Sequence, residues 1–169
     1  MTALRLYTDG SCQSSGATVG GWAWILVREQ PVDCDAGNTF ERPNQHRCEL
    51  TAAIEGLTYL LAQGIGEVEV VSDSRHMVGG MSSTGCKGCT GWAHAAAKRG
   101  WRIKGGKPMA NRELWKQLLG LDRRLSVSWR HVRSHRPKKD TSDDARYNRE
   151  VDALAVKARQ GIVEESCQG

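Results

Sequence analysis

Hydrophobic and polar positions change their period along the early part of the chain. Residues 4–9 alternate in the manner of a strand, and residues 20–27, rich in Trp and Ile, predict a second strand. A weaker run at 35–40 predicts a third strand at a sheet edge. Residues 44–63 repeat their apolar positions at helical spacing instead, so one face of a predicted helix carries Leu50, Ala53, Ile54, Leu57 and Leu61.

Strands and helices alternate in the rest of the chain. Strands are predicted at 67–73 and 125–129, and helices at 74–81, 92–99, 111–124 and 148–159. Asn111 stands where the third of these helices should begin, and we expect its side chain to cap that helix. The order of elements, β-β-β-α-β-α-α-α-β-α, predicts an α/β (mixed) fold, with a five-stranded mixed sheet flanked by helices.

The length of 169 residues suits one domain, which we expect to span residues 1–161 and to be followed by a tail at 162–169. With 39% hydrophobic and 25% charged residues, the composition is that of an ordinary globular protein. The longest apolar runs are too short to cross a membrane, and the N-terminus shows no secretory leader pattern. We therefore expect a cytoplasmic protein with no membrane partner. We also expect a monomer, independently of these patterns.

The positive charge of the chain is concentrated in one segment. The formal net charge is +5, and residues 74–112 hold eight basic residues and no acid. Such a segment favours a polyanionic partner, for example a nucleic acid. The alternative is a solvated basic face, which is common on protein surfaces.

The six cysteines are spread along the chain, and only Cys86 and Cys89 lie close together. Free thiols are the default in a cytosolic protein, so we expect the cysteines to be reduced. A single C-x-x-C pair is a weak zinc signal because a structural zinc site needs four ligands. Zinc binding at Cys86 and Cys89 is therefore the less favoured interpretation.

Four acidic residues occupy positions from which they can converge. Asp9 and Asp73 each end a predicted strand, and functional side chains gather at the carboxyl ends of parallel strands. Glu49 lies at the edge of the apolar face of the intervening helix, and Asp152 lies in the first turns of the last helix. Neighbouring carboxylates repel one another unless divalent cations neutralise them. The pattern favours a metal-dependent phosphotransferase or nuclease, while the alternative is that each acid only forms a turn or favours a helix N-terminus.

Four segments resemble the motifs of ribonuclease H, type 1. They are YTDGSC at 7–12, RCELTAA at 47–53, SDS at 72–74 and NREVDALA at 148–155, in the family's order and at about its spacing. The resemblance implies the ribonuclease H-like fold. It also implies an endoribonuclease that hydrolyses the RNA strand of RNA–DNA hybrids by a two-metal-ion mechanism and leaves 5′-phosphate products.

The resemblance further implies the residues that carry this chemistry. Two Mg²⁺ ions, for which Mn²⁺ is a possible substitute, would bind to Asp9, Glu49, Asp73 and Asp152. His135 would be a further catalytic residue that shuttles a proton as the product leaves, a role that suits a side chain with a pKa near neutrality.

The same resemblance assigns residues to the two strands of an RNA–DNA hybrid. The family's basic protrusion, which grips the DNA strand, corresponds to Lys98, Arg99 and Trp101, with Trp92 beside it. A DNA phosphate would be bound by Arg42, Asn44 and Asn111. Contacts to RNA would come from Cys12, Gln45 and His46. Arg75, which departs from the family's pattern, adds a positive charge near the site and is expected to contact a phosphate. For Trp101, packing in the core is the alternative.

This sequence departs from the family's pattern in four places. The turn after Cys12 is one residue longer, His46 stands where Asn or Gln is usual, Arg75 stands where Gln is common, and residues 135–148 form a longer segment. Two other functions are kept as alternatives. One is a nuclease of the same fold, such as a junction resolvase, and the other is a non-catalytic hybrid-binding module.

Overall fold

The computed structural model describes residues 3–13, 16–82, 90–134, 137 and 139–162. The strands of this part of the chain form one sheet in the order β3-β2-β1-β4-β5. Their bounds are β1 Arg5–Cys12, β2 Gly20–Val27, β3 Pro31–Thr39, β4 Glu67–Ser72 and β5 Ser126–His131. The first three strands are antiparallel neighbours, whereas β4 runs parallel to both β1 and β5. The prediction of a mixed five-stranded sheet is confirmed.

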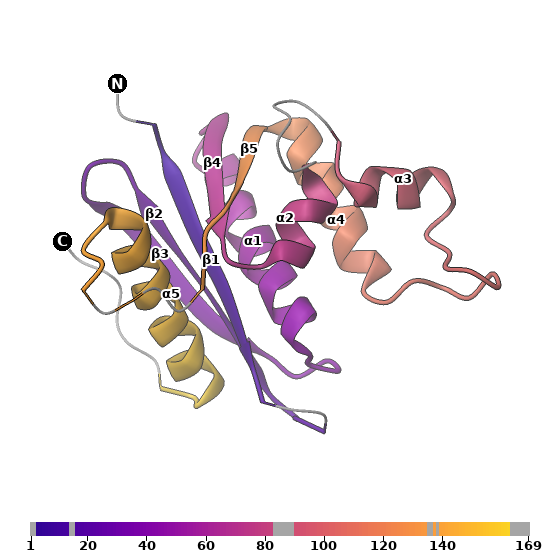
Figure 1. Cartoon of the computed structure of the whole chain (residues 1–169), viewed down its shortest axis with the longest axis horizontal. Coiled ribbons are helices and arrows are strands. Elements are labelled where there is room, and N and C mark those ends of the chain that lie inside the picture. The colour runs from indigo at the N-terminus through magenta and orange to yellow at the C-terminus, as the bar shows by residue number, and fades with distance from the viewer. Residues whose placement is uncertain (1–2, 14–15, 83–89, 135–136, 138, 163–169) are drawn as a thin grey trace.

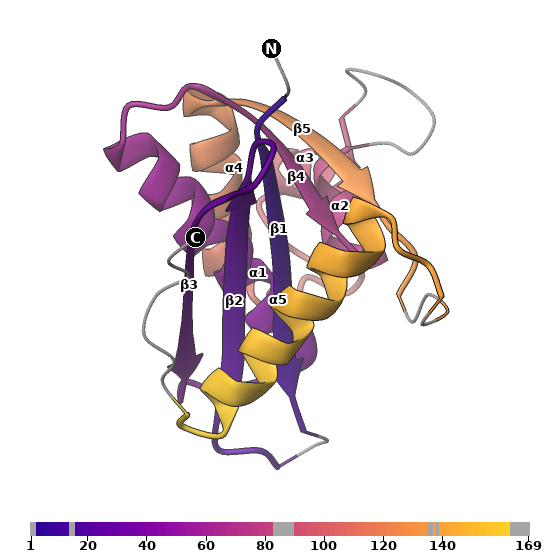
Figure 2. The same cartoon turned by 90° about the vertical axis from the view of Figure 1, so that its left-hand side faces the viewer.

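Helices cover both faces of the sheet (Figures 1 and 2). Their bounds are α1 Gln45–Ala62, α2 Arg75–Met81, α3 Trp92–Lys98, α4 Arg112–Arg124 and α5 Asp143–Arg159. Helix α5 lies alone across one face, and α1 and α4 lie on the other (Figure 2). Helix α3 and the loop that follows it project away from the sheet (Figure 1). No helix among the described residues is long and apolar enough to cross a membrane.

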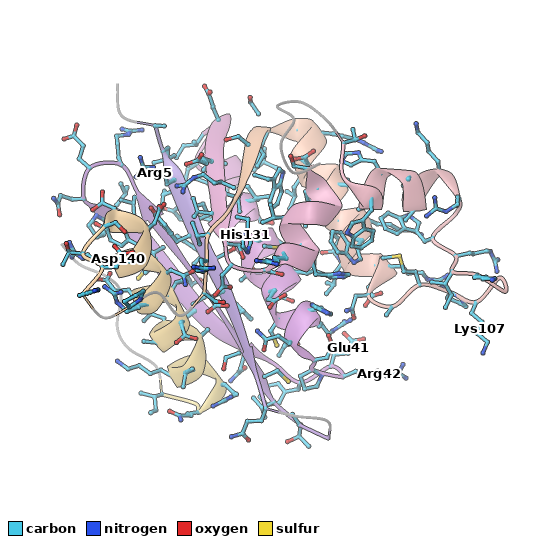
Figure 3. The ribbon with its side chains drawn as sticks, in the orientation of Figure 1. Arg5, Glu41, Arg42, Lys107, His131 and Asp140 are labelled. Atoms are coloured by element: carbon cyan, nitrogen blue, oxygen red, sulfur yellow. The ribbon has the colours of Figure 1, made fainter. Side chains whose placement is uncertain are left out.

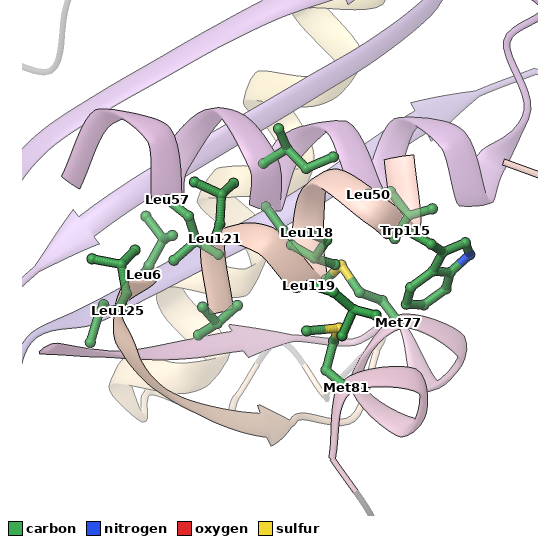
Figure 4. Close-up of a cluster of buried hydrophobic side chains, with 14 of the residues drawn as sticks. Leu6, Leu50, Leu57, Met77, Met81, Trp115, Leu118, Leu119, Leu121 and Leu125 are labelled. Atoms are coloured by element: carbon green, nitrogen blue, oxygen red, sulfur yellow. The ribbon is translucent and has the colours of Figure 1, made fainter. Parts of the chain in front are cut away.

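Strand β1 supplies side chains to two cores because successive residues of a strand point to opposite faces. Leu6 is fully buried against α1 and α4, in the larger core shown in Figure 4. Its neighbour Tyr7 is fully buried on the other face, where Val151 of α5 packs. Truncating a buried leucine of this kind to alanine costs about 2–5 kcal/mol. The two cores fix α1 and α5 on opposite sides of the same central strand.

Two glycines allow these helices to approach the sheet closely. A Cβ atom added to Gly10 of β1 would lie 2.4 Å from the backbone nitrogen of Glu49 on α1. A Cβ atom added to Gly21 of β2 would lie 2.0 Å from the carbonyl oxygen of Ala155 on α5. Both distances are too short for any side chain, so glycine is required at both positions. Glu49 and the middle of α5 are thereby held beside β1.

Three predicted boundaries differ from the structure because long-range contacts extend the elements. Strand β1 does not end at Asp9, since antiparallel pairing with β2 continues to Cys12 opposite Gly20. Strand β3 begins at Pro31 rather than at residue 35 because it pairs along the whole of β2. Helix α5 begins at Asp143 rather than at residue 148.

The early start of α5 has an identifiable cause. Ser142 caps the helix by accepting a hydrogen bond from the amide of Ala145. Asp144, in the first turn, accepts a hydrogen bond from the Tyr7 hydroxyl and pairs with Arg130 of β5. Asp152 consequently lies more than two turns into the helix and not in its first turns.

Two further sequence-based expectations are corrected. Asn111 precedes α4 but has left-handed backbone angles (φ 54°), and its side chain makes no capping hydrogen bond. Cys34 is disulfide-bonded, whereas Cys12 and Cys48 are free. The expectation of reduced cysteines rested on an assumed compartment, which carries no geometric information. Cys86 and Cys89 lie outside the described residues.

Candidate active site

The four candidate acids come from four different elements around the middle of the sheet. The parallel register pairs Tyr7 of β1 with Val71 of β4. Asp9 and Asp73 each stand two residues beyond these partners, so Asp9, within β1, lies beside Asp73, which directly follows β4. Glu49 joins them from α1, where it is bonded to Ser74. Asp152 is exposed on α5, on the opposite face, and is close enough for its charge to raise the pKa of Asp9 and Asp73.

Asp9 is the most strongly perturbed of these acids. Its side chain is buried, with the residue only 5% exposed, and it accepts a hydrogen bond of 2.7 Å from the amide of Gly10. Burial, and then the negative charges of Asp73, Asp152 and Glu49, raise its pKa to about 8 against the opposing effect of the Gly10 amide. The site therefore disfavours a negative charge on Asp9 unless a cation is present.

Asp73 is less buried and has partners that favour its ionised form. Burial raises its pKa, and the charges of Glu49 and Asp152 add to this increase. Asn148 of α5 opposes the shift by donating to Oδ2 of Asp73 at 3.5 Å. His131 of β5 also lowers the pKa, and its Nε2 lies 3.2 Å from the backbone carbonyl oxygen of Asp73. Figure 3 shows His131 near the centre of the molecule.

Glu49 is held in place by two side chains of its own helix, α1, and by the residue that caps α2. The hydroxyl of Ser74, which also caps α2, donates to Oε2 of Glu49 at 2.6 Å. Gln45 donates to Oε1 of Glu49 at 3.0 Å and to the carbonyl oxygen of Gly10 at 2.7 Å. Nδ1 of His46 lies 3.3 Å from Oε2. The orientation of the Glu49 carboxylate is thus determined by its neighbours rather than by solvent.

The donor set fits hard divalent cations. The charges of Glu49 and Asp152 raise the pKa of both Asp9 and Asp73, and carboxylate oxygens are the ligands that Mg²⁺ prefers. Among the described residues, no three His, Cys, Asp or Glu side chains form a ready-made site for one ion. The cluster nevertheless contains a buried carboxyl that ionises with difficulty. Bound cations would neutralise the negative charge that opposes its ionisation.

A cavity of about 570 Å³ opens beside these acids. Its walls are formed by His46, Glu49, Asp73, Ser74, Arg75, His76, His131, Arg133 and Ser134. The wall carries three histidines and two arginines beside two of the acids, so an anionic ligand would meet positive or hydrogen-bonding groups there. Prediction from the sequence placed Arg75 at this site but missed Ser74, His76 and His131.

An aromatic stack leads from the cavity into the core. The rings of His46 and His76 lie 4.2 Å apart between centroids, and His76 lies 4.9 Å from Trp92. Trp92 meets the fully buried Trp115 edge to face at 4.6 Å. Trp92 is therefore partly buried and braces the histidines, while the exposed His46 presents a ring toward the cavity.

The three residues predicted to bind a DNA phosphate lie around the beginnings of α1 and α4. Asn44 caps α1 by accepting from the amide of Arg47, and Asn111 donates to Asn44 Oδ1 at 3.5 Å. Arg42 is exposed in the preceding loop with a positive φ of 46° (Figure 3). Asn44 and Asn111 are thus brought together, although they are distant in the sequence.

The residues predicted to contact RNA lie beside Glu49. Gln45 accepts a hydrogen bond from the amide of Cys12 at 3.2 Å in addition to its two donated bonds. The Gln45 amide is therefore used within the protein. His46 is exposed and free to meet a ligand on the side of its ring that faces away from His76.

The basic segment projects from the body of the protein. Lys98 and Arg99 are exposed at the end of α3, and Lys107 marks the tip of the following loop (Figure 3). Trp101, in contrast, is 5% exposed and belongs to the larger core. Its predicted substrate contact is corrected to core packing, since its ring has almost no accessible surface. His135 lies outside the described residues.

Solved structures with similar folds support this arrangement. The crystal structure of LC9-RNase H1, a type 1 RNase H with the type 2 active-site motif, has a TM-score of 0.75 and 24% sequence identity, over 96% of this chain and 74% of that one. The structure of LC11-RNase H1 in complex with RNA/DNA hybrid has a TM-score of 0.63 and 16% identity, over 95% and 99% of the two chains. The architecture is that of the ribonuclease H-like proteins.

Comparison of sequences identifies the family within this fold. A family model described as RNase H matches residues 1–160. The ribonuclease H of Acidithiobacillus ferrooxidans is 33% identical over 162 residues, covering 94% of each chain. That of Hahella chejuensis is 36% identical over 135 residues, covering 80% of this chain and 83% of the relative. The chain belongs to the ribonuclease H family and is an endoribonuclease.

Proposed function

We propose that this protein hydrolyses the RNA strand of RNA–DNA hybrids with the help of two bound Mg²⁺ ions. The observation that carries the proposal is the buried Asp9 carboxyl, whose pKa is raised to about 8 beside Asp73, Glu49 and Asp152 on a ribonuclease H fold. A buried carboxyl with this electrostatic cost destabilises the fold unless a cation neutralises the site. Such a cluster is what a cation-dependent nuclease requires.

Asp9, Glu49, Asp73 and Asp152 are the residues that would hold the ions. When bound, the two ions activate water and stabilise the leaving oxygen of an in-line displacement. The protein's own contribution is orientation. Ser74 and Gln45 fix the Glu49 carboxylate, and Asn148 fixes that of Asp73. We assign proton transfer during product release to His135, on the strength of the family resemblance.

The hybrid would lie across the cavity, with its two strands on different groups of residues. His46 faces the RNA strand, where a 2′-hydroxyl offers both a donor and an acceptor. Arg42, Asn44 and Asn111 would bind a phosphate of the DNA strand, and Lys98 and Arg99 would bind the same strand farther along. Contacts of this kind position a duplex without reading its sequence, so we expect little sequence preference.

A substrate panel tests this proposal. The protein is incubated with labelled RNA–DNA hybrid, single-stranded RNA, double-stranded RNA, double-stranded DNA and a four-way DNA junction, each with Mg²⁺ and with EDTA. We expect Mg²⁺-dependent cleavage of the RNA in the hybrid alone. Preferred cleavage of the junction would support a resolvase instead. Hybrid binding without any turnover would support the non-catalytic module.

A further inference from the structure

A buried arginine links the two helix ends that form the phosphate-binding region. Arg47 lies in the first turn of α1, and its side chain is only 10% exposed. Its Nη1 donates to Oδ1 of Asn111 at 3.3 Å and pairs with Glu113 at 2.5 Å. Because its own amide donates to Asn44, Arg47 connects both predicted phosphate ligands. An always-charged, planar guanidinium is suited to such multiple fixed contacts.

Glu113 and Glu41 both pair with Arg47, but the side chain of Glu41 is more exposed to solvent. Glu113 is at the first turn of α4, and its hydrogen bond with Arg47 lowers the pKa of its carboxyl. Glu41 lies in the loop before α1 and contacts the other terminal nitrogen, Nη2, at 3.3 Å. Its side chain is 83% exposed, so it is held mainly by this one contact (Figure 3). An exposed ion pair of this kind contributes little to stability.

We propose that Arg47 is a positioning residue that also binds a DNA-strand phosphate, and that Glu41 is a counter-ion displaced when this phosphate binds. Glu113 then anchors Nη1 throughout, while Nη2 exchanges the Glu41 carboxylate for a phosphate oxygen. The exchange conserves the pairing of the buried charge, since one oxygen anion replaces another. This inference rests on the proposed function only in that the substrate contains a DNA strand.

The energetics favour such an exchange. Leaving a buried guanidinium without a partner is costly, so an isolated Arg47 would be destabilising. Glu113 meets this requirement at Nη1, and Glu41 adds a second partner at Nη2 in the free protein. The negative charge of Glu41 also repels an approaching phosphate. Removing the charge of Glu41 should therefore strengthen hybrid binding, even though it removes an ion pair seen in the structure.

The test measures hybrid binding in EDTA, where cleavage cannot occur. Glu41→Gln is compared with wild type and with Glu67→Gln, which makes the same charge change at an exposed position at the start of β4. We expect Glu41→Gln to bind a short labelled hybrid about three- to fivefold more tightly at low salt, and Glu67→Gln to change binding less than about twofold.

A second pair of variants separates a direct exchange from a general charge effect. Arg47→Lys keeps the charge but loses the planar fork that serves Asn111, Glu113 and Glu41 together. In that background the gain from Glu41→Gln should disappear. It should also disappear when the DNA strand carries uncharged methylphosphonate linkages. A thermal melt checks that Arg47→Lys is folded.

Three results would overturn the inference. They are an unchanged or weaker affinity in Glu41→Gln, an equal gain in Glu67→Gln, and a gain that persists with Arg47→Lys or with the methylphosphonate strand. Failure of the wild-type protein to cleave hybrid with Mg²⁺ would reject the proposed function. The binding test of Glu41→Gln could still be interpreted after such a failure, because binding is measured without metal.

Discussion

Ser74 donates its hydroxyl hydrogen bond to Glu49 at 2.6 Å across the gap between α2 and α1. The same oxygen accepts the amide of Met77 and so caps α2. Ser74 therefore performs two tasks at once. Ser74 caps α2, the helix that follows Asp73, and it also fixes the carboxylate of Glu49 in the site.

Replacing Ser74 with alanine should reduce both stability and activity. Loss of the cap should lower the free energy of unfolding by about 1 kcal/mol. Loss of the bond to Glu49 should lower kcat about tenfold. Ser142→Ala is the matched control, since it removes the cap of α5 without touching Glu49. It should cost similar stability and leave kcat unchanged. Equal activity in the two variants would show that Ser74 is only a cap.

The raised pKa of Asp9 predicts an unusual dependence of stability on pH in the metal-free protein. Asp9 stays protonated in the folded state up to about pH 8 but ionises near pH 4 when unfolded. The unfolded state then binds fewer protons, so this contribution to stability falls as pH rises through that window. Asp9→Asn should therefore melt higher than wild type at pH 8 in EDTA, by about 5 °C, and the difference should vanish near pH 4.

Metal addition provides the complementary measurement. Mg²⁺ should raise the melting temperature of the wild type at pH 8, because cations relieve the repulsion at Asp9, and should have little effect on Asp9→Asn. The exposed Asp35→Asn is the control and should shift the melting temperature by less than about 2 °C. A wild-type stability that does not change between pH 4 and pH 8 would contradict the electrostatic description of the cluster.

The projecting basic segment predicts a salt-dependent contribution to binding. Lys98→Ala together with Arg99→Ala should weaken hybrid binding and reduce the slope of log K against log salt by about 1 to 2. Arg123→Ala with Arg124→Ala, at the exposed C-terminal end of α4, is the matched control. It should leave the slope unchanged. Identical slopes in the two double variants would remove α3 from the binding surface.

The close contact between β1 and α1 predicts opposite outcomes for two glycine substitutions. Gly10→Ala places a Cβ atom against the backbone of Glu49 and should destabilise the protein by about 3 kcal/mol or more. Gly120→Ala, within α4, meets open space and should stabilise the protein by about 0.5–1 kcal/mol. Chemical denaturation measures both. A well-tolerated Gly10→Ala would mean that α1 does not need to lie this close to the strand.

The order of the elements could be predicted because periodicity is a local property of the sequence. The residues at which the strands and helices end could not be predicted, since these ends depend on contacts with residues distant in the sequence. The pairing of Cys12 with Gly20 extends β1 beyond Asp9. The first turn of α5 is polar, so its sequence resembles that of a loop. In the structure, Asp144 stabilises this turn through its hydrogen bonds with Tyr7 and Arg130.

The same distinction applies to the candidate site. The proximity of Asp9 and Asp73 follows from the parallel arrangement of two strands that a helix connects. The bond of Ser74 to Glu49 and that of Gln45 to the carbonyl oxygen of Gly10 join side chains to distant elements and leave no pattern in the sequence. The ion pairs of Arg47 are equally invisible there. The metal ligands, the role of His135, the monomeric state and the cytoplasmic location stay predictions.

The most direct test of the central claim is a single-turnover cleavage assay on an RNA–DNA hybrid with labelled RNA. Wild type and Asp9→Asn are compared with Mg²⁺ and with EDTA. We predict that the wild type cuts the RNA only with Mg²⁺, and that Asp9→Asn, although folded, is at least about a hundredfold slower. Cleavage by wild type in EDTA, or by Asp9→Asn at the wild-type rate, would contradict the assignment of this carboxylate cluster as the catalytic site.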